Sequence, residues 1–252
     1  MTEIFQPRFY RKWTSSSRLV GFNVQVDETD LAVRASAELS KETKELVIKH
    51  RQDLLGYAKD HPRFLTSFKP LPVEPGVPEI VRLMADSAAQ YDVGPMAAVA
   101  GAIAELVGEA LLQRIRESTE TAGRPAEVII ENGGDCFMKT DEPATVTLYA
   151  GPESPFQDKL RLRIDSHDGP RGVCTSSGTM GHSVSFGKAD AVVILARSAA
   201  LADAAATAIC NAVKEPERIK EIIEKEEKRG KLLGLVIAMG KHLGAWGEIE
   251  II

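Results

Sequence analysis

The sequence predicts an α+β protein in which a mixed, largely antiparallel sheet packs against helices. Residues 160–165 alternate apolar and charged side chains, which indicates a strand with one buried and one solvated face. Residues 41–60 place apolar side chains at helical spacing, and residues 96–117 are apolar on nearly all sides, as in a central helix. One-sided burial of the strands favours antiparallel pairing over an all-parallel sheet.

Each further element follows from local signals along the chain. Ser40 is expected to cap the helix 41–60. The five prolines between 62 and 78 predict an extended connection without regular structure, with Pro78 opening a second helix. Two further helices are expected at 198–213 and 216–229, and a hairpin turn that holds His242 at 240–244. The expected strands lie at 19–26, 31–35, 127–130, 136–138, 144–150, 159–164, 172–175, 189–196, 232–239 and 248–252.

Length and composition bound the class of protein. The 252 residues and 44% hydrophobic content can build one large core, and the segments on either side of 61–78 are too incomplete to fold alone, so we expect a single domain over 1–252. A net charge of −5 and only 6% aromatic residues argue against binding to nucleic acid. The expected partner is a small-molecule ligand, and the sequence leaves a homo-oligomer open.

The predicted compartment is the cytoplasm. Three widely spaced cysteines form neither a disulfide framework nor a zinc motif. The N-terminal residues lack the apolar core of a signal peptide. Glu105, Gly108 and Glu109 interrupt the longest apolar stretch, which therefore indicates a buried helix rather than a membrane partner.

A first candidate ligand loop follows the strand that ends near residue 130. Its sequence is Glu131-Asn132-Gly133-Gly134-Asp135. Paired glycines allow positive φ and bring backbone N–H groups close to a ligand, while Asp135 can accept a hydrogen bond from a ligand hydroxyl or ring N–H. An ordinary turn explains the same residues, and for this loop alone it is the favoured reading.

A second loop, residues 172–183, carries hydroxyl groups and glycines at a density that favours function over a plain connection. Thr175, Ser176, Ser177 and Gly178 suit phosphate or sugar oxygens. His182 fits a general base or a phosphate contact, or else hydrogen-bonds within its own loop. The order of residues is not that of a Walker loop.

Two further side chains have a chemical and a structural interpretation. Asp190 precedes an apolar strand, where a carboxylate can hold Mg²⁺ or cap the strand end. Cys174 could pair with His182 as a nucleophile, but a buried strand cysteine is the favoured interpretation.

The order of these motifs resembles the ApbE-like superfamily over about residues 20–250. Its best-known members are FAD:protein FMN transferases, which bind FAD and Mg²⁺ and attach FMN to a threonine of an acceptor protein. The segments Glu-Asn-Gly-Gly-Asp and Cys-Thr-Ser-Ser-Gly-Thr are closer to an uncharacterised branch of that superfamily. The resemblance implies an ApbE-like fold and a site for FAD or a related flavin.

Matching positions carry the implied site onto this chain. Gly133–Asp135 match the Gly-Gly-Asp loop beside the flavin. Thr175, Ser176 and Gly178 match the Thr-Ser-Gly segment, and Asp190–Ala191 match the Asp-Ala of the metal-binding segment. The transferases have a metal-holding threonine four positions after that aspartate, where this chain has Ile194. They also have a lysine on the central helix, where this chain has Ala100.

These differences shape the expected function. We expect a protein that binds a flavin or nucleotide-like ligand, binds Mg²⁺ weakly, and transfers FMN poorly. In this hypothesis His182 assists proton transfer and Asp190 is the residue that could hold a metal. The alternative is a non-catalytic binding module that kept the pocket and lost the metal chemistry, and a nucleophilic enzyme built on Cys174 and His182 ranks last.

Overall fold

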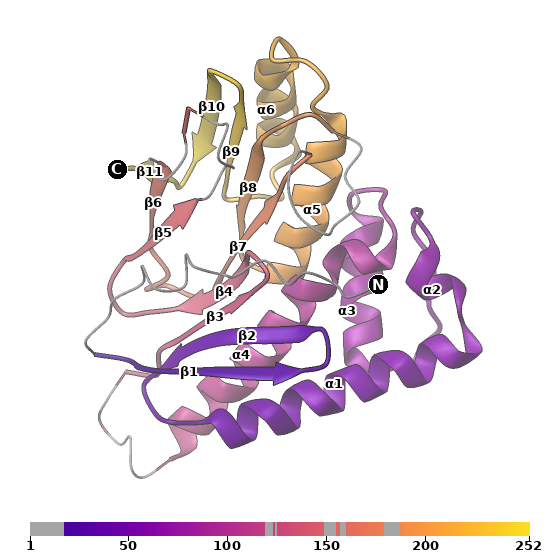
Figure 1. The fold of residues 1–252 in the computed structure, drawn as a ribbon, viewed down its shortest axis with the longest axis vertical. Helices are drawn as coiled ribbons and strands as arrows, with labels where there is room; N and C mark the ends of the chain where they lie inside the picture. The colour runs from indigo at the N-terminus through magenta and orange to yellow at the C-terminus, as the bar shows by residue number, and fades with distance from the viewer. Residues whose placement is uncertain (1–17, 119–122, 124, 149–154, 157–159, 179–186) are drawn as a thin grey trace.

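The computed structural model describes residues 18–118, 123, 125–148, 155–156, 160–178 and 187–252. An eight-stranded sheet runs from the N-terminal hairpin at one edge to a C-terminal hairpin at the other (Figure 1), and every neighbouring pair in it is antiparallel. In spatial order its strands are β1 (Val20–Val26), β2 (Thr29–Ala35), β3 (Val128–Asn132), β4 (Asp135–Lys139), β7 (Arg171–Ser176), β8 (Ala191–Ala196), β9 (Gly234–Met239) and β10 (His242–Gly247). The predicted antiparallel sheet is confirmed.

A three-stranded sheet covers one face of the large sheet. It consists of β5 (Ala144–Leu148), β6 (Leu160–Ile164) and β11 (Glu250–Ile251), with β6 in the middle. The apolar residues of β6 are buried and its arginines are exposed, as the alternation predicts. Both sheets contribute to one cluster of buried residues, which includes Met138, Val173 and Leu195 from the large sheet.

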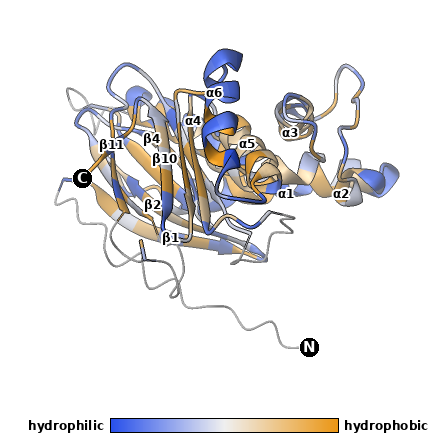
Figure 2. Ribbon diagram, turned by 90° about the horizontal axis from the view of Figure 1, so that it is seen from above, coloured by the Kyte–Doolittle hydropathy of each residue, from blue (hydrophilic) through white to orange (hydrophobic). Residues whose placement is uncertain are grey.

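Helices cover the opposite face, so the described part of the protein has three layers: helices, large sheet and small sheet. Figure 2 shows the helices on one side of the large sheet and β11 on the other. The helices are α1 (Ser40–Asp60), α2 (Arg63–Thr66), α3 (Glu79–Ala89), the 3₁₀ helix η2 (Pro95–Ala98), α4 (Val99–Glu117), α5 (Ala199–Ala212) and α6 (Arg218–Arg229).

The predicted central helix is α4, which packs against β3, β4 and α5. The stretch Pro95–Glu117 has the length and composition of a membrane span, but 67% of its most apolar window is buried inside the protein. Gly108 lets this helix approach the sheet, because a Cβ at this position would lie 2.2 Å from Cδ1 of Phe137. The helix is thus a core element, as its all-round apolar pattern indicates.

Three local predictions were wrong. Ser40 is the first residue of α1, and Leu39 occupies the cap position. The short helix Arg63–Thr66 forms inside the proline-rich connection, because Pro62 sits just before it at φ −61°, a value that suits a helix start. His242 begins strand β10 rather than lying in the turn, which is made by Gly240 and Lys241.

We expect Gly108→Ala to lower the free energy of unfolding by about 1–3 kcal/mol, because the ring of Phe137 is fully buried and has little room to move. Gly56→Ala is the matched control, since Gly56 is also a helical glycine and its Cβ would meet no atom within 4 Å. That variant should gain about 0.5–1 kcal/mol from helix propensity. Urea unfolding of both variants measures the difference, and equal midpoints would contradict this account of α4 packing.

Candidate functional site

The two predicted ligand loops meet at one end of the large sheet. Asn132 and Asp135 face each other across the β3–β4 turn. Strand β7 lies beside β4 in antiparallel orientation, so its C-terminal end reaches the start of β4. The backbone N–H of Thr175 donates to Oδ1 of Asp135 over 3.2 Å. Residues far apart in the sequence therefore form one strand-end cluster, while their roles toward a ligand stay a prediction.

The β3–β4 turn requires both of its glycines. Gly133 and Gly134 have φ values of 68° and 105°, which other residues rarely adopt. The N–H of Gly134 donates to Oε1 of Glu131 over 2.8 Å, so this amide is already used within the turn. Asn132 donates from Nδ2 to the carbonyl of Ala100 over 3.1 Å, which attaches the turn to the start of α4.

The second loop also uses its backbone internally. The N–H of Gly178 donates to the carbonyl of Ala189 over 2.9 Å, and a Cβ on Gly178 would lie 2.4 Å from the carbonyl oxygen of Gly187. The N–H of Thr175 is likewise bonded within the protein, to Asp135. The hydroxyls of Thr175, Ser176 and Ser177 stay the predicted ligand contacts, and His182 lies outside the described residues.

Asp190 has a structural role in the described part of the chain. Its backbone N–H donates to the carbonyl of Ala238, and its Oδ2 accepts from the N–H of Gly240 over 2.8 Å. The carboxylate therefore supports the turn between β9 and β10. This contact is the strand-end role that the sequence left open beside the metal role.

A carboxylate that the sequence reasoning missed lies beside Asp135. Asp203 on α5 accepts at Oδ2 from the N–H of Gly101 over 2.9 Å, which caps the N-terminal turn of α4. Burial raises the pKa of Asp203 to about 7. Burial, followed by the charge of Asp203, raises the pKa of Asp135, against the hydrogen bond from Thr175. The charge of Asp203 thus disfavours ionisation of the neighbouring Asp135 carboxyl.

A sequence signal for Asp203 exists. The chain reads Asp203-Ala204-Ala205-Ala206-Thr207, which is the Asp-Ala-x-x-Thr spacing of the metal-binding segment that the resemblance implies. Asp203 and Thr207 are four residues apart on α5, so they project from the same face of that helix. The alanine-rich stretch has the pattern of a core helix, which hides this motif in the sequence, whereas the Asp-Ala pair at 190–191 follows directly after the glycine-rich loop.

Cys174 is a buried strand cysteine, as the favoured interpretation holds. Its Sγ donates to the carbonyl of Ala199 over 3.3 Å, and its side chain is fully buried. Burial and the nearby charge of Asp135 raise the pKa of the thiol, so it stays protonated at neutral pH. These contacts speak against a nucleophilic role.

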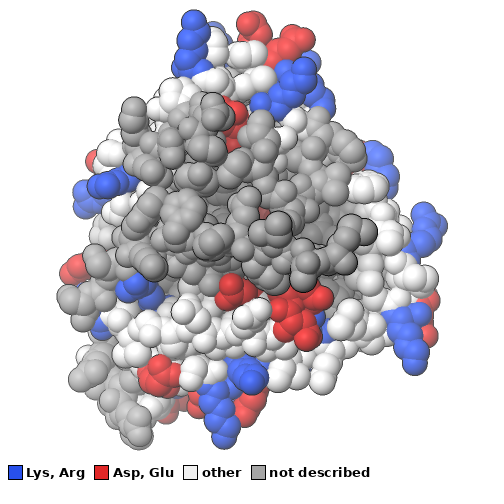
Figure 3. Space-filling view, viewed as in Figure 1, with Lys and Arg blue, Asp and Glu red and all other residues white. Residues whose placement is uncertain are grey.

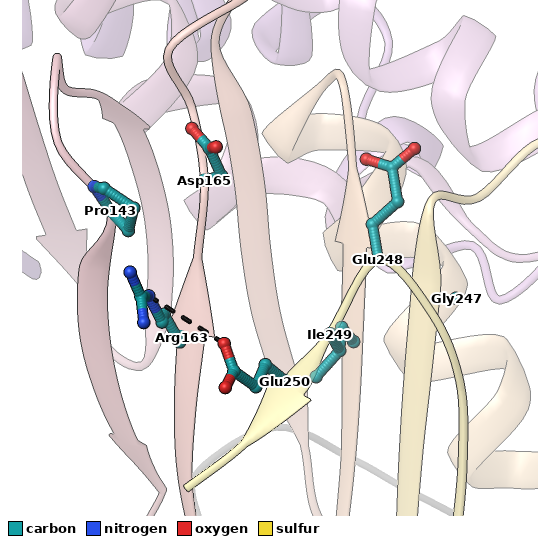
Figure 4. A pocket seen from close by; sticks show the side chains of 7 residues that line it. All are labelled: Pro143, Arg163, Asp165, Gly247, Glu248, Ile249 and Glu250. Carbon is teal, nitrogen blue, oxygen red and sulfur yellow. Dashed lines mark ion pairs between the residues drawn. The ribbon is translucent and has the colours of Figure 1, made fainter.

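A shallow cleft of about 550 Å³ lies elsewhere, between β6 and the β10–β11 connection (Figure 4). Arg163 and Glu250 form an ion pair of 3.8 Å in it, and Asp165 and Glu248 also line it. None of the predicted site residues that the structure describes lines this cleft. On the described surface in Figure 3, basic and acidic side chains lie interspersed, in agreement with the mixed charges of the sequence.

The sheet topology and helical layer define an α+β protein with the ApbE fold. The structure is similar to the apo crystal structure of Pseudomonas stutzeri flavinyl transferase ApbE, with a TM-score of 0.53 and 15% identity over 90% of this chain and 93% of that chain. The flavin transferase ApbE of Vibrio cholerae gives a TM-score of 0.51 and 13% identity over 90% of this chain and 96% of that chain.

The chain belongs to the family described as AbpE bacteria, whose model matches residues 11–229. It is 40% identical over 229 residues to UPF0280 protein MJ1526 of Methanocaldococcus jannaschii, a match that covers 89% of both chains. It is 42% identical over 194 residues to UPF0280 protein MK0206 of Methanopyrus kandleri, covering 77% of this chain and 74% of that relative. The predicted family and fold are confirmed.

The raised pKa of Asp203 predicts a pH-dependent stability. Folding favours the protonated carboxyl of Asp203. The contribution of this group to the free energy of unfolding is therefore fully present below the ordinary pKa of 3.8 and is lost as the pH rises through about 7. Asp203→Asn keeps an acceptor for the Gly101 N–H and removes the charge. The urea midpoint of this variant should therefore rise relative to wild type between pH 5 and pH 8 in EDTA.

The exposed residue Asp86 on α3 provides the control for this measurement. Asp86→Asn should keep the same midpoint difference from wild type at both pH values. If Asp203→Asn behaves in the same way, folding does not disfavour the ionised form of Asp203.

Proposed function

We propose that this protein binds a flavin nucleotide together with a divalent cation. The proposed site consists of the strand-end cluster, with Asn132–Asp135 and Thr175–Gly178, and of the first two turns of α5 beside it. The observation that carries the proposal is the position of Asp203 beside Asp135, with Thr207 one turn further along α5. In the transferases that the sequence resembles, an aspartate and the threonine four positions later hold Mg²⁺. The chain has both residues on one helix face.

The residues fit a magnesium ion by their chemistry. Mg²⁺ prefers oxygen ligands and is commonly held by one or two carboxylates. Asp203 lies beside Asp135 and its charge raises the pKa of the Asp135 carboxyl, so a divalent cation between or beside the two would relieve their repulsion. The metal role predicted for Asp190 accordingly moves to Asp203. Weak Mg²⁺ binding was expected because Ile194 cannot be a ligand. In this proposal Thr207 supplies the hydroxyl ligand, so that expectation no longer applies.

The chain's own groups divide the work of binding in this proposal. Hydroxyls of Thr175, Ser176 and Ser177 contact phosphate oxygens, and the β3–β4 turn lies against the ring or ribose. A bound cation would neutralise charge on the pyrophosphate oxygens of the ligand. His182 remains the residue proposed to assist proton transfer.

A non-catalytic binding module is the second candidate, and Ala100 favours it. A lysine is expected there in the transferases, whereas here the Ala100 carbonyl accepts from Asn132 and its side chain carries no charge. Incubation with FAD, Mg²⁺ and a threonine-bearing peptide separates the two candidates by mass spectrometry. A flavin–peptide adduct that Asp203→Asn abolishes would establish transfer, and cation-dependent FAD binding without an adduct would establish the module.

For binding itself, we expect Mg²⁺ to tighten the affinity for FAD, as measured by quenching of flavin fluorescence. Thr207→Val keeps the shape of the side chain and removes the hydroxyl ligand. The midpoint of the Mg²⁺ titration, which is the concentration that gives half of the effect on FAD binding, should therefore rise on the order of tenfold. Asp190→Asn tests the reassignment, since it should leave that midpoint near the wild-type value. The opposite ranking of the two variants would return the cation to Asp190.

A further inference from the structure

Glu105 is a buried carboxylate in the middle of α4, with 9% of its surface exposed. Removing a carboxylate from water is unfavourable unless hydrogen bonds or a cation compensate. Its Oε2 accepts from the hydroxyl of Ser198 over 2.7 Å and from the N–H of Ala200 over 2.9 Å. Burial raises the pKa of Glu105, and these hydrogen bonds oppose that rise.

The partners of Glu105 are the first groups of α5. Ser198 is the cap residue of that helix and also accepts from the N–H of Leu201 over 3.2 Å. A carboxylate at this end of a helix satisfies otherwise unpaired N–H groups and is favoured by the helix dipole. Glu105 thus holds the N-terminal turn of α5 from outside.

Asp203 lies three residues after Ala200 and makes the reciprocal contact. It accepts from Gly101 on α4, one turn before Glu105. Each helix therefore caps the other through a carboxylate. The two contacts, together with the short helical segments between them, form a closed loop of interactions between α4 and α5. There is little slack at this crossing, because a Cβ on Gly101 would lie 2.2 Å from the carbonyl oxygen of Ala199.

We propose that Glu105 is a positioning residue for the cation site at Asp203 and Thr207, because its bonds to Ser198 and Ala200 set the rotation and height of the first turn of α5. A helical turn fixes the direction of the residues that follow, so a shift at Ala200 moves the Asp203 carboxylate. This inference rests on the proposed cation binding. Glu105 itself is not a ligand in it.

Three variants separate positioning from general support. Glu105→Met keeps the length of the side chain and removes both acceptor oxygens. Glu105→Gln keeps an oxygen that can accept from both donors, since both converge on one atom in the wild type. Glu109→Met is the matched control, one turn along the same helix at an exposed position.

The probe is Mn²⁺, titrated with and without FAD and followed by the electron paramagnetic resonance signal of the free ion. Glu105→Met should weaken Mn²⁺ binding on the order of tenfold. Glu105→Gln and Glu109→Met should stay close to wild type, and Asp203→Asn should lose the site. A purely structural role would lower the melting temperature of Glu105→Met and leave the Mn²⁺ affinity of the folded protein unchanged, which would overturn the inference.

A second readout needs no metal. Hydrogen exchange of the Gly101 amide reports its bond to Asp203 and should be faster in Glu105→Met than in Glu109→Met. Unchanged exchange would show that Glu105 does not control Asp203. If Glu105→Met does not fold, Ser198→Ala removes one donor of the same contact and is measured instead.

The two proposals fail in different ways. Absence of Mn²⁺ binding by the wild type overturns the proposed function, and the positioning role with it. Wild-type binding that Asp203→Asn abolishes and Glu105→Met preserves overturns the positioning role alone.

Discussion

The mutual capping of α4 and α5 by two carboxylates is the constraint on which the candidate site depends. Glu105 bonds the start of α5, and Asp203 bonds the start of α4. A carboxylate leaves water only where donors replace its hydration, and the unpaired N–H groups of a helix start are such donors. The two helices therefore stabilise each other's weakest ends, and this arrangement places Asp203 next to the sheet.

Small residues allow the close approach that this capping needs. A Cβ on Gly172 would lie 2.3 Å from the Cα of Ala199, and Gly101 approaches the carbonyl of the same residue from the other side. Ala199 is thus held between strand β7 and helix α4. Because packed interiors transmit small displacements, a larger residue at either glycine would move α5 and the carboxylate that it carries.

The sequence predicted some features of the strand-end cluster and missed others. The glycine pair at 133–134 was predicted from its turn chemistry, and its positive φ values agree with that reason. The amide of Gly134 was expected to face a ligand, yet it bonds Glu131. A turn that must hold its own shape uses its donors internally, which a sequence pattern does not reveal. Strand β10 was also missed, because its polar start and two glycines give no alternating pattern.

The sequence by itself determined the class of fold, the buried character of α4 and the existence of two glycine-rich loops, because periodicity and turn chemistry are properties of neighbouring residues. Only the tertiary structure decided which carboxylates meet. Asp190 and Asp203 both begin an Asp-Ala pair, but antiparallel pairing takes the first to the β9–β10 turn, and helix crossing takes the second to Asp135. Contacts between distant segments arise from strand register and helix packing, which no local window of sequence contains.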